Sequence, residues 1–427
     1  MISVNKSRTT SPHPRADGGI VGADVAASTT QAGLNAAVRQ YRLKLMQTFM
    51  SENSCDALAF LTPDWFEWAG NHSVRESAWE RPFLLLVTAS GRAIGFLSEQ
   101  TRHHAAASRT RGSLWVDRLV FFAETPAARA HGWTTPDWAR MVASVVAEEG
   151  LGNSRILADA GTAPWNGALG LLPSVRAGTA GTALRALRRV KHPEEIRAMR
   201  VAASLSDWAM RQFRTDLRPG CNLAATDYQV AAKLSLEAAG RVPGSDYLIG
   251  SITTLSGAAS ACPKGDGASC GKSLENDSVA VTTVATKLDG VSMELARTWL
   301  IGQPEREAYR YLQIVGEAQQ AALDAILPGK PASGVHAAAQ AVFDRHGIGS
   351  ELVLRAGHGV GVTIHDFPED LPFDDRPLVA NEVLAIEPGA YIGGLGGFRF
   401  ADTVVVRPAG AEHLTIFPKD LETISIC

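Results

Sequence analysis

Hydrophobic and polar positions recur with helical spacing along much of this chain. Within residues 35–54, the apolar residues Val38, Tyr41, Leu45 and Phe49 are three or four positions apart, which predicts an amphipathic helix. Similar patterns predict helices over residues 135–149, 180–189, 224–239, 304–326 and 335–346. Short apolar runs predict strands over residues 56–61 and 155–159, and a strand pair over residues 82–97 that turns at Ser90-Gly91.

The order of these elements changes near residue 190. Before it, alternating helices and strands predict a small α/β domain. After it, Pro193 is followed by Glu194 and Glu195, a typical start of a helix, because proline and acidic residues favour the first turn. Beyond that helix the chain is β-rich over residues 245–302 and glycine- and strand-rich over 351–427. We therefore predict a disordered tail (1–34), an N-terminal domain (35–189) and a C-terminal domain (190–427).

Charge and cysteine usage narrow the classes of partner. Lys and Arg total 41 against 44 Asp and Glu, a net charge of −3, which argues against a nucleic-acid-binding protein. No uninterrupted apolar stretch is long enough to span a membrane. The five cysteines are scattered and form no CxxC pair, which is typical of free thiols in a reducing compartment. We expect a cytoplasmic protein that acts on a small molecule.

Five segments of the second half carry a resemblance to a known family. In chain order they are RRVKHPEEIRAMRVAA, MELART, AGHGVGVTIHDFP, LAIEPGAYI and GGFRFADTVVV. Their order and spacing resemble those of the creatinase/aminopeptidase P superfamily. The resemblance implies an α+β chain, with an N-terminal creatinase-like α/β domain followed by a C-terminal pita-bread domain. It also implies a homodimer.

The metallopeptidases of that superfamily hold two ions with Asp, Asp, His, Glu and Glu. The resemblance places these five positions at Thr283, Glu294, His358, Glu387 and Ala401. A threonine is a poor ligand and an alanine is none, so one ion should be lost. Because creatinases use this fold without a metal, we expect no metal and no other cofactor.

Three residues are the predicted catalytic groups. His358 lies between two glycines, and its imidazole could move protons near neutral pH; the alternative is a turn histidine bonded to backbone. Glu387 ends an apolar strand, where a buried carboxylate needs a cation, a metal or a proton donor, unless it only binds turn amides. Glu294 lies within an apolar strand, and its alternative is an exposed position of an alternating strand.

Three further residues are predicted to bind substrate. His365 matches the second histidine of the resemblance. Arg399 matches an arginine before the last ligand and could hold a substrate carboxylate, with an ion pair to Asp402 or Glu387 as the alternative. Lys264 lies in a glycine-containing loop, where it could bind an anion or be solvated. Cys262 in the same loop would need an activating base to act as a nucleophile.

Three functions remain open at this point. The first is a metal-independent, creatinase-like enzyme that cleaves a C–N bond in a small amidine, ureido compound or cyclic amide. The second is a one-metal Xaa-Pro-type peptidase or amidase. The third is a non-catalytic pita-bread binding protein, against which the presence of both histidines and both glutamates argues.

Overall fold

The computed structural model describes residues 33–76, 80–123, 135–265 and 271–427. The predicted disordered tail, apart from Gly33 and Leu34, lies outside the described residues, as does Cys270. Among the described residues, no helix is both long enough and apolar enough to cross a membrane.

The N-terminal part is built on a six-stranded sheet with the order β4-β3-β2-β1-β5-β6. Its strands are β1 (Ala57–Phe60), β2 (Leu84–Thr88), β3 (Ala93–Ser98), β4 (Arg118–Phe122), β5 (Arg155–Ala158) and β6 (Arg176–Thr179). The pairs β1–β2 and β2–β3 are antiparallel and the other three are parallel. The turn between β2 and β3 uses Gly91 at φ +89°, a conformation that favours glycine.

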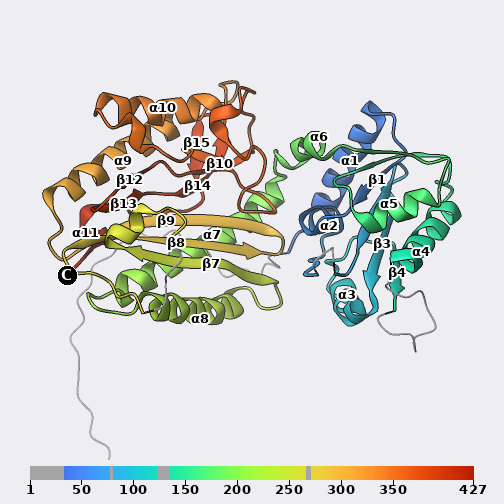
Figure 1. Ribbon diagram of the computed structural model, residues 1–427, viewed down its shortest axis with the longest axis horizontal. Coiled ribbons are helices and arrows are strands. Elements are labelled where there is room, and N and C mark those ends of the chain that lie inside the picture. Colours follow the sequence, from blue (N-terminus) through green and yellow to red (C-terminus); the bar gives the residue numbers. More distant parts are fainter. Residues whose placement is uncertain (1–32, 77–79, 124–134, 266–270) are drawn as a thin grey trace, which may run out of the picture. The chain divides into compact units, whose positions relative to one another are not determined.

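Helices cover both faces of this sheet. They are α1 (Ala36–Glu52), α2 (Pro63–Gly70), α3 (Arg102–Thr110), α4 (Thr135–Glu148), α5 (Ala163–Gly170) and α6 (Gly181–Arg185), with 3-10 turns η1 (Glu99–Thr101) and η2 (Ala186–Arg188). Alternate residues of a strand point to opposite faces. Accordingly, Leu58 and Phe60 of β1 join the core under α1 and α2, whereas Ala57 and Ala59 join the core under α4 and α5. Figure 1 shows these helices packed around the sheet.

Several short elements of this part were not predicted. Pro63 is the first residue of α2, where its missing N–H leaves no helical hydrogen bond unmade. Helix α3 (RHHAAASRT) has little apolar periodicity, and the β6 residues Arg176–Thr179 are mostly exposed. Strand β6 is defined by its pairing with β5, which a local pattern does not reveal.

The C-terminal part repeats an order of two helices followed by strands. The first set is α7 (Pro193–Asp216), α8 (Leu223–Arg241), β7 (Tyr247–Ser256), η3 (Gly257–Ala261), β8 (Ser278–Leu288) and β9 (Val291–Ile301). The second set is α9 (Arg306–Asp324), α10 (Ser333–Arg345), η4 (Gly349–Glu351), β10 (Gly357–Gly359), η5 (Leu371–Phe373), β11 (Val383–Ile386), β12 (Gly389–Ile392), β13 (Gly396–Arg399), β14 (Asp402–Arg407), β15 (Gly410–His413), α11 (Leu421–Ile424) and β16 (Ser425–Ile426).

These strands form two four-stranded sheets and a hairpin. The sheets have the orders β16-β9-β8-β7 and β10-β11-β14-β15, and the hairpin is β12-β13. An isolated bridge between Ala296 and Ala401 connects the two sheets, with both N···O distances at 3.1 Å. One hydrophobic core contains residues from both sheets, from the β12–β13 hairpin and from α7 to α10.

Helix α7 begins as its sequence predicts. The His192 ring accepts from the Glu194 amide at 3.2 Å, and the Glu195 carboxylate accepts from the His192 amide at 2.7 Å, so two amides of the first turn are satisfied. Just before it, the Lys191 amide donates to the Asn381 carbonyl at 2.9 Å. The domain boundary near Val190 stays a prediction.

A buried ion pair lies beside the bridge between the sheets. Arg297 and Asp402 are each 1% exposed, with 2.7 Å between Nη2 and Oδ1. Arg297 also donates to the carbonyls of Ala296 (2.8 Å) and Ala401 (3.0 Å), and Lys419 Nζ lies 3.1 Å from Asp402 Oδ2. Burial alone would raise the pKa of Asp402, but the charges of Arg297 and Lys419 outweigh burial and lower it to about 2.

Replacing Asp402 by asparagine should therefore destabilise the protein. Arg297 would keep its buried charge without a counter-charge, which typically costs about 3–5 kcal/mol. The matched control is Glu307→Gln, which removes an exposed ion pair with Arg310 (3.1 Å) and should cost less than about 1 kcal/mol. Urea unfolding of the full chain measures both.

The wild type should also lose stability relative to Asp402→Asn as pH falls from about 4 towards 2, because only the wild type must protonate this carboxylate on acidification. Equal unfolding midpoints for the two variants would contradict this role of the pair.

Candidate functional site

Two neighbouring strands carry the first pair of predicted site positions. In the β8–β9 register, Thr283 lies opposite Ala296 and Ala285 lies opposite Glu294. Positions two apart on a strand share a face, so Thr283 and Glu294 lie diagonally on the same face of the sheet. Glu294 is buried, with 6% of its surface exposed, and the alternative of an exposed strand position is not what the structure shows.

The other sheet brings His358 and Glu387 to the same place. His358 is the central residue of β10 and lies opposite Ala385 of β11, and Glu387 follows the last residue of β11. The close approach of the two strands requires glycine beside the histidine, because a Cβ on Gly357 would lie 2.3 Å from the Ala385 carbonyl oxygen. The GHG segment is thus a consequence of strand packing as well as of chemistry.

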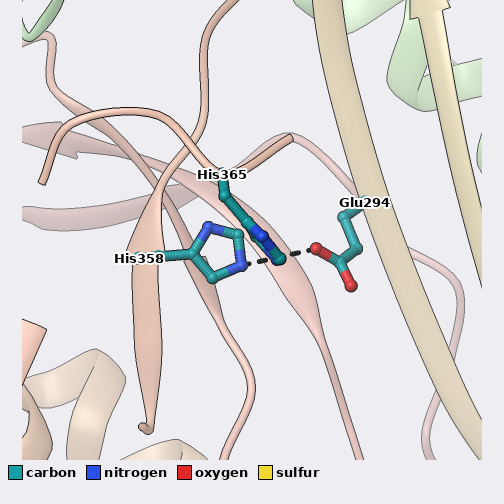
Figure 2. Close-up of side chains that lie close together, drawn as sticks. All are labelled: Glu294, His358 and His365. Carbon is teal, nitrogen blue, oxygen red and sulfur yellow. Dashed lines mark ion pairs between the residues drawn. The ribbon is translucent and has the colours of Figure 1, made fainter. Parts of the chain in front are cut away.

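His358 lies between the two glutamates. Its Nε2 is 3.2 Å from Glu387 Oε1, and the ring is fully buried. The same Nε2 is 3.4 Å from Glu294 Oε2 (Figure 2). Its Nδ1 is 2.9 Å from the Gly359 carbonyl, which can only accept, so Nδ1 carries the hydrogen. Neither carboxylate is aligned for a directed hydrogen bond, so Nε2 has no hydrogen-bond partner among the described residues. Nε2 therefore faces two carboxylates, ready to take a proton or a ligand.

Charge sets the protonation of this group. Burial would lower the pKa of His358, but Glu294 and Glu387 outweigh burial and raise it to about 10. Burial would raise the pKa of Glu294, but His358, Arg399 and His365 outweigh burial and lower it to about 2. Without a bound ion, the centre therefore contains an imidazolium beside an ionised Glu294.

His365 lies at the exposed side of this centre. Its ring is 4.3 Å from the His358 ring between centroids and nearly perpendicular to it, at 82° (Figure 2). Burial of part of the ring, and then the charge of His358, lower its pKa, so it is neutral at neutral pH. Glu294, His358 and His365 each offer one ligand atom, and these atoms lie within 4.8 Å of one another.

Arg399 closes the other side of the centre. Its Nη1 lies 3.5 Å from Glu387 Oε2, and its Nη2 donates to the Thr283 hydroxyl. Burial would lower the pKa of Arg399, but Tyr391, Glu387 and Glu294 raise it above its usual value, so the guanidinium stays charged. Of the two ion pairs considered for Arg399, the structure shows the one with Glu387, while Asp402 pairs with Arg297.

Tyr391 is a site residue that the sequence analysis did not identify. In the β12–β13 register, Gly389 lies opposite Arg399 and Tyr391 opposite Gly397, so Tyr391 and Arg399 share a face. A Cβ on Gly389 would lie 2.8 Å from the Tyr391 hydroxyl, which accounts for the glycine of the EPG segment. Burial raises the pKa of Tyr391, so its hydroxyl stays protonated. In the sequence, Glu387, Gly389 and Tyr391 are each two residues apart. This alternation is the feature that could have identified Tyr391 as a residue of the site.

The donor set does not fit two metal ions. Ala401 offers no side-chain donor, and Asp402 cannot replace it, because successive strand residues point to opposite sides and Asp402 pairs with Arg297. Thr283 already accepts a hydrogen bond from Arg399. One ion does fit: Glu294 and Glu387 supply carboxylate oxygens, and deprotonation of His358 would free the Nε2 lone pair that faces them.

Lys264 and Cys262 do not join this cluster. Both are exposed in the turn after η3, and among the described residues neither contacts Glu294, His358, Glu387 or Arg399. A role for Lys264 in binding substrate remains a prediction. The base that Cys262 would need as a nucleophile is likewise not found among the described residues around it.

Comparisons with known proteins identify the family of this chain. Residues 197–408 match the family described as metallopeptidase family M24. The chain is 33% identical over 265 residues to the probable dipeptidase PepE of Mycobacterium tuberculosis, covering 62% of this chain and 67% of the relative. It is 30% identical over 238 residues to the Xaa-Pro dipeptidase of Pyrococcus furiosus, covering 56% of this chain and 66% of the relative. These matches therefore span about two thirds of the relatives' own length.

A solved structure extends the likeness over most of the chain. Dipeptidase PepE from Mycobacterium ulcerans superposes with a TM-score of 0.74 at 24% identity, covering 92% of this chain and 100% of that one. The predicted fold class, an α+β chain with a creatinase-like N-terminal domain and a pita-bread domain, is confirmed. The resemblance to the creatinase/aminopeptidase P superfamily is confirmed with it. The chain belongs to metallopeptidase family M24.

Proposed function

We propose that this protein is a hydrolase that cleaves the C–N bond of small Xaa-Pro-type dipeptides or related amides, at a centre that holds at most one divalent ion. The relatives named as Xaa-Pro dipeptidases and dipeptidases support this function better than the metal-independent, creatinase-like enzyme that the sequence analysis put first. A small-molecule substrate, a homodimer and a cytoplasmic location remain parts of the proposal.

One observation carries the proposal: a fully buried His358 whose Nε2 faces two buried carboxylates without a directed hydrogen bond. Burying two carboxylates and an imidazole together is costly, because each charged group loses its hydration. Such a cluster is expected where a substrate or an ion completes the site.

The charge balance favours one ion over two. Glu294 and Glu387 contribute two negative charges and Arg399 one positive charge. One divalent ion with a neutral His358 leaves a single positive charge, which the carboxylate of a dipeptide would neutralise. Two ions would leave three positive charges in a buried space, and uncompensated buried charge is strongly unfavourable.

Each residue of the centre has a separate role in hydrolysis. When bound, an ion would act as a Lewis acid towards the substrate carbonyl. The Gly359 carbonyl holds His358 in the tautomer that presents Nε2 to the centre. His365, neutral and at the exposed side, is placed to exchange a hydrogen bond or a proton with the scissile amide. Arg399 pairs with Glu387, with 3.5 Å between Nη1 and Oε2, and so keeps a positive charge beside this carboxylate.

A second candidate is the metal-independent, creatinase-like enzyme on an amidine, ureido compound or cyclic amide. The observation that favours it is the protonated His358, which with Arg399 balances both carboxylates without any ion. The same two glutamates would pair with the planar N–H groups of an amidine. The two candidates differ in whether a chelator removes activity and in which substrates are turned over.

Replacing His358 by alanine or Glu387 by glutamine should lower the turnover of Xaa-Pro dipeptides at least about 100-fold, because both groups act in the chemistry. The matched control is His346→Ala, which removes an exposed histidine that pairs with Glu317 at 2.8 Å and should leave turnover unchanged. Assays with added manganese or zinc, and with chelator, are run on Xaa-Pro dipeptides and on creatine-like substrates. Parent-level turnover by His358→Ala would refute the catalytic role. Turnover of only amidine-type substrates, insensitive to chelator, would promote the second candidate.

Restoring the two missing carboxylates should create a second ion site. In Thr283→Asp/Ala401→Glu, two oxygen donors return to the face that carries Glu294, and their charge offsets a second ion. The wild type should bind no more than about one equivalent of manganese or zinc, and the double variant about two, by elemental analysis and calorimetry. The control Thr283→Asn/Ala401→Gln has the same shapes without the charge and should bind like the wild type. Two equivalents in the wild type would show that the donor set has been misjudged.

A further inference from the structure

A buried arginine outside the site is directed at the segment that carries the two histidines. Arg188, in η2, is 7% exposed. Its Nε and Nη2 lie 3.0 and 2.9 Å from one oxygen of Asp366, and its Nη1 lies 2.5 Å from Asp64 Oδ2. The guanidinium also lies over the Trp65 ring, 4.6 Å from its centroid. Every side of this charge is therefore occupied by a partner.

Asp366 in turn holds together the turn that follows β10. Its Oδ2 accepts from the Val362 amide at 3.0 Å, and its Oδ1 accepts from the Phe367 amide at 2.8 Å. The turn is tight here, because a Cβ on Gly361 would lie 2.3 Å from Asp366 Oδ2. The 1% exposed carboxylate is thus an internal brace that needs a counter-charge, and Arg188 supplies it.

The brace connects directly to both histidines. The Gly359 carbonyl accepts the Asp366 amide at 2.8 Å and the His358 Nδ1 at 2.9 Å, so one oxygen fixes the turn and the imidazole together. His365 is the residue before Asp366. The same turn docks on β9, where the Ser292 amide donates to the Gly361 carbonyl at 2.7 Å, two residues from Glu294. A shift of Asp366 would therefore move the groups that meet at the centre.

We infer that Arg188 and Asp366 form a clamp that positions His358 and His365 for catalysis, although neither residue touches the reacting atoms. Arg188 is a positioning residue, and its planar fork is required, because two of its nitrogens share one carboxylate oxygen while a third reaches Asp64. The effect on turnover rests on the proposed function. The effect on the turn does not.

The neighbouring Arg185 provides a matched control. It pairs with Glu369 at 2.7 Å, also a few residues from His365, but its side chain is 50% exposed and that of Glu369 is 38% exposed. An exposed pair of this kind contributes little, so Arg185→Ala should leave both the turn and the turnover as they are in the wild type.

The experiment compares Arg188→Ala, Asp366→Asn and Arg185→Ala in the full chain. Amide hydrogen exchange at Val362, Asp366 and Phe367 should be at least about tenfold faster in the first two variants, with β11 amides unchanged as the internal reference. Turnover of an Xaa-Pro dipeptide should fall about 10- to 100-fold in kcat, with KM within about threefold, as expected for misplaced groups. Millimolar guanidinium should reverse both effects in Arg188→Ala, whereas methylammonium, which has the charge without the planar fork, should not.

The outcomes separate the two proposals. If exchange in the turn accelerates and guanidinium slows it again while no dipeptide is turned over by any form, the clamp stands and the proposed substrate class fails. If exchange at the three amides is unchanged in both Arg188→Ala and Asp366→Asn, the clamp is refuted, whatever the turnover. Faster exchange throughout the β11 reference as well, without rescue by guanidinium, would mark Arg188 as a general stabilising residue and also overturn the inference.

Discussion

The burial of two carboxylates beside one imidazole is the constraint on which this site depends. Glu294 and Glu387 are each 6% exposed, and a buried carboxylate requires a nearby positive charge or strong donors. Arg399 supplies one positive charge permanently, and the second comes either from a proton on His358 or from a bound ion. Proton and ion therefore compete for the same Nε2, so the state of one histidine decides which of the two candidate chemistries this centre supports.

Strand geometry determines whether a neighbouring carboxylate can replace a missing metal ligand. Asp402 is adjacent in sequence to the empty position Ala401, yet it cannot serve there, because alternation along the strand directs it to the other side. On that side it balances Arg297, which binds the carbonyls of Ala296 and Ala401 and so braces the bridge between the two sheets. Asp402, which seems from the sequence to be a possible metal ligand, thus stabilises the fold instead.

The sequence predicted best those helices and site residues that a local apolar pattern or a chemical motif marks. The helices at residues 36–52, 193–216, 223–241 and 306–324 each bury several apolar residues at helical spacing, and the GHG and EPG segments mark His358 and Glu387. It failed where the information is in pairing or packing: β6 has no apolar pattern of its own, and Tyr391 joins the site only through the β12–β13 register. Lys264 is exposed and does not contact the centre among the described residues, so its role in binding substrate stays a prediction.

The clamp of Arg188 and Asp366 is a second case in which a buried charge is balanced by a specific partner, here outside the site. The segment RRVK precedes helix α7, and a run of basic residues in a sequence would by itself be interpreted as a solvated surface. Its burial reverses that interpretation: Arg188 at 7% exposure and Lys191 at 4% are desolvated, which is tolerated only where specific partners repay the cost. For Arg188 those partners are Asp64 and Asp366, and Asp366 shares the Gly359 carbonyl with His358. The C-terminal domain, in which Thr283 and Ala401 occupy two of the expected metal-ligand positions, thus still depends on the charge of Arg188 in the segment before it.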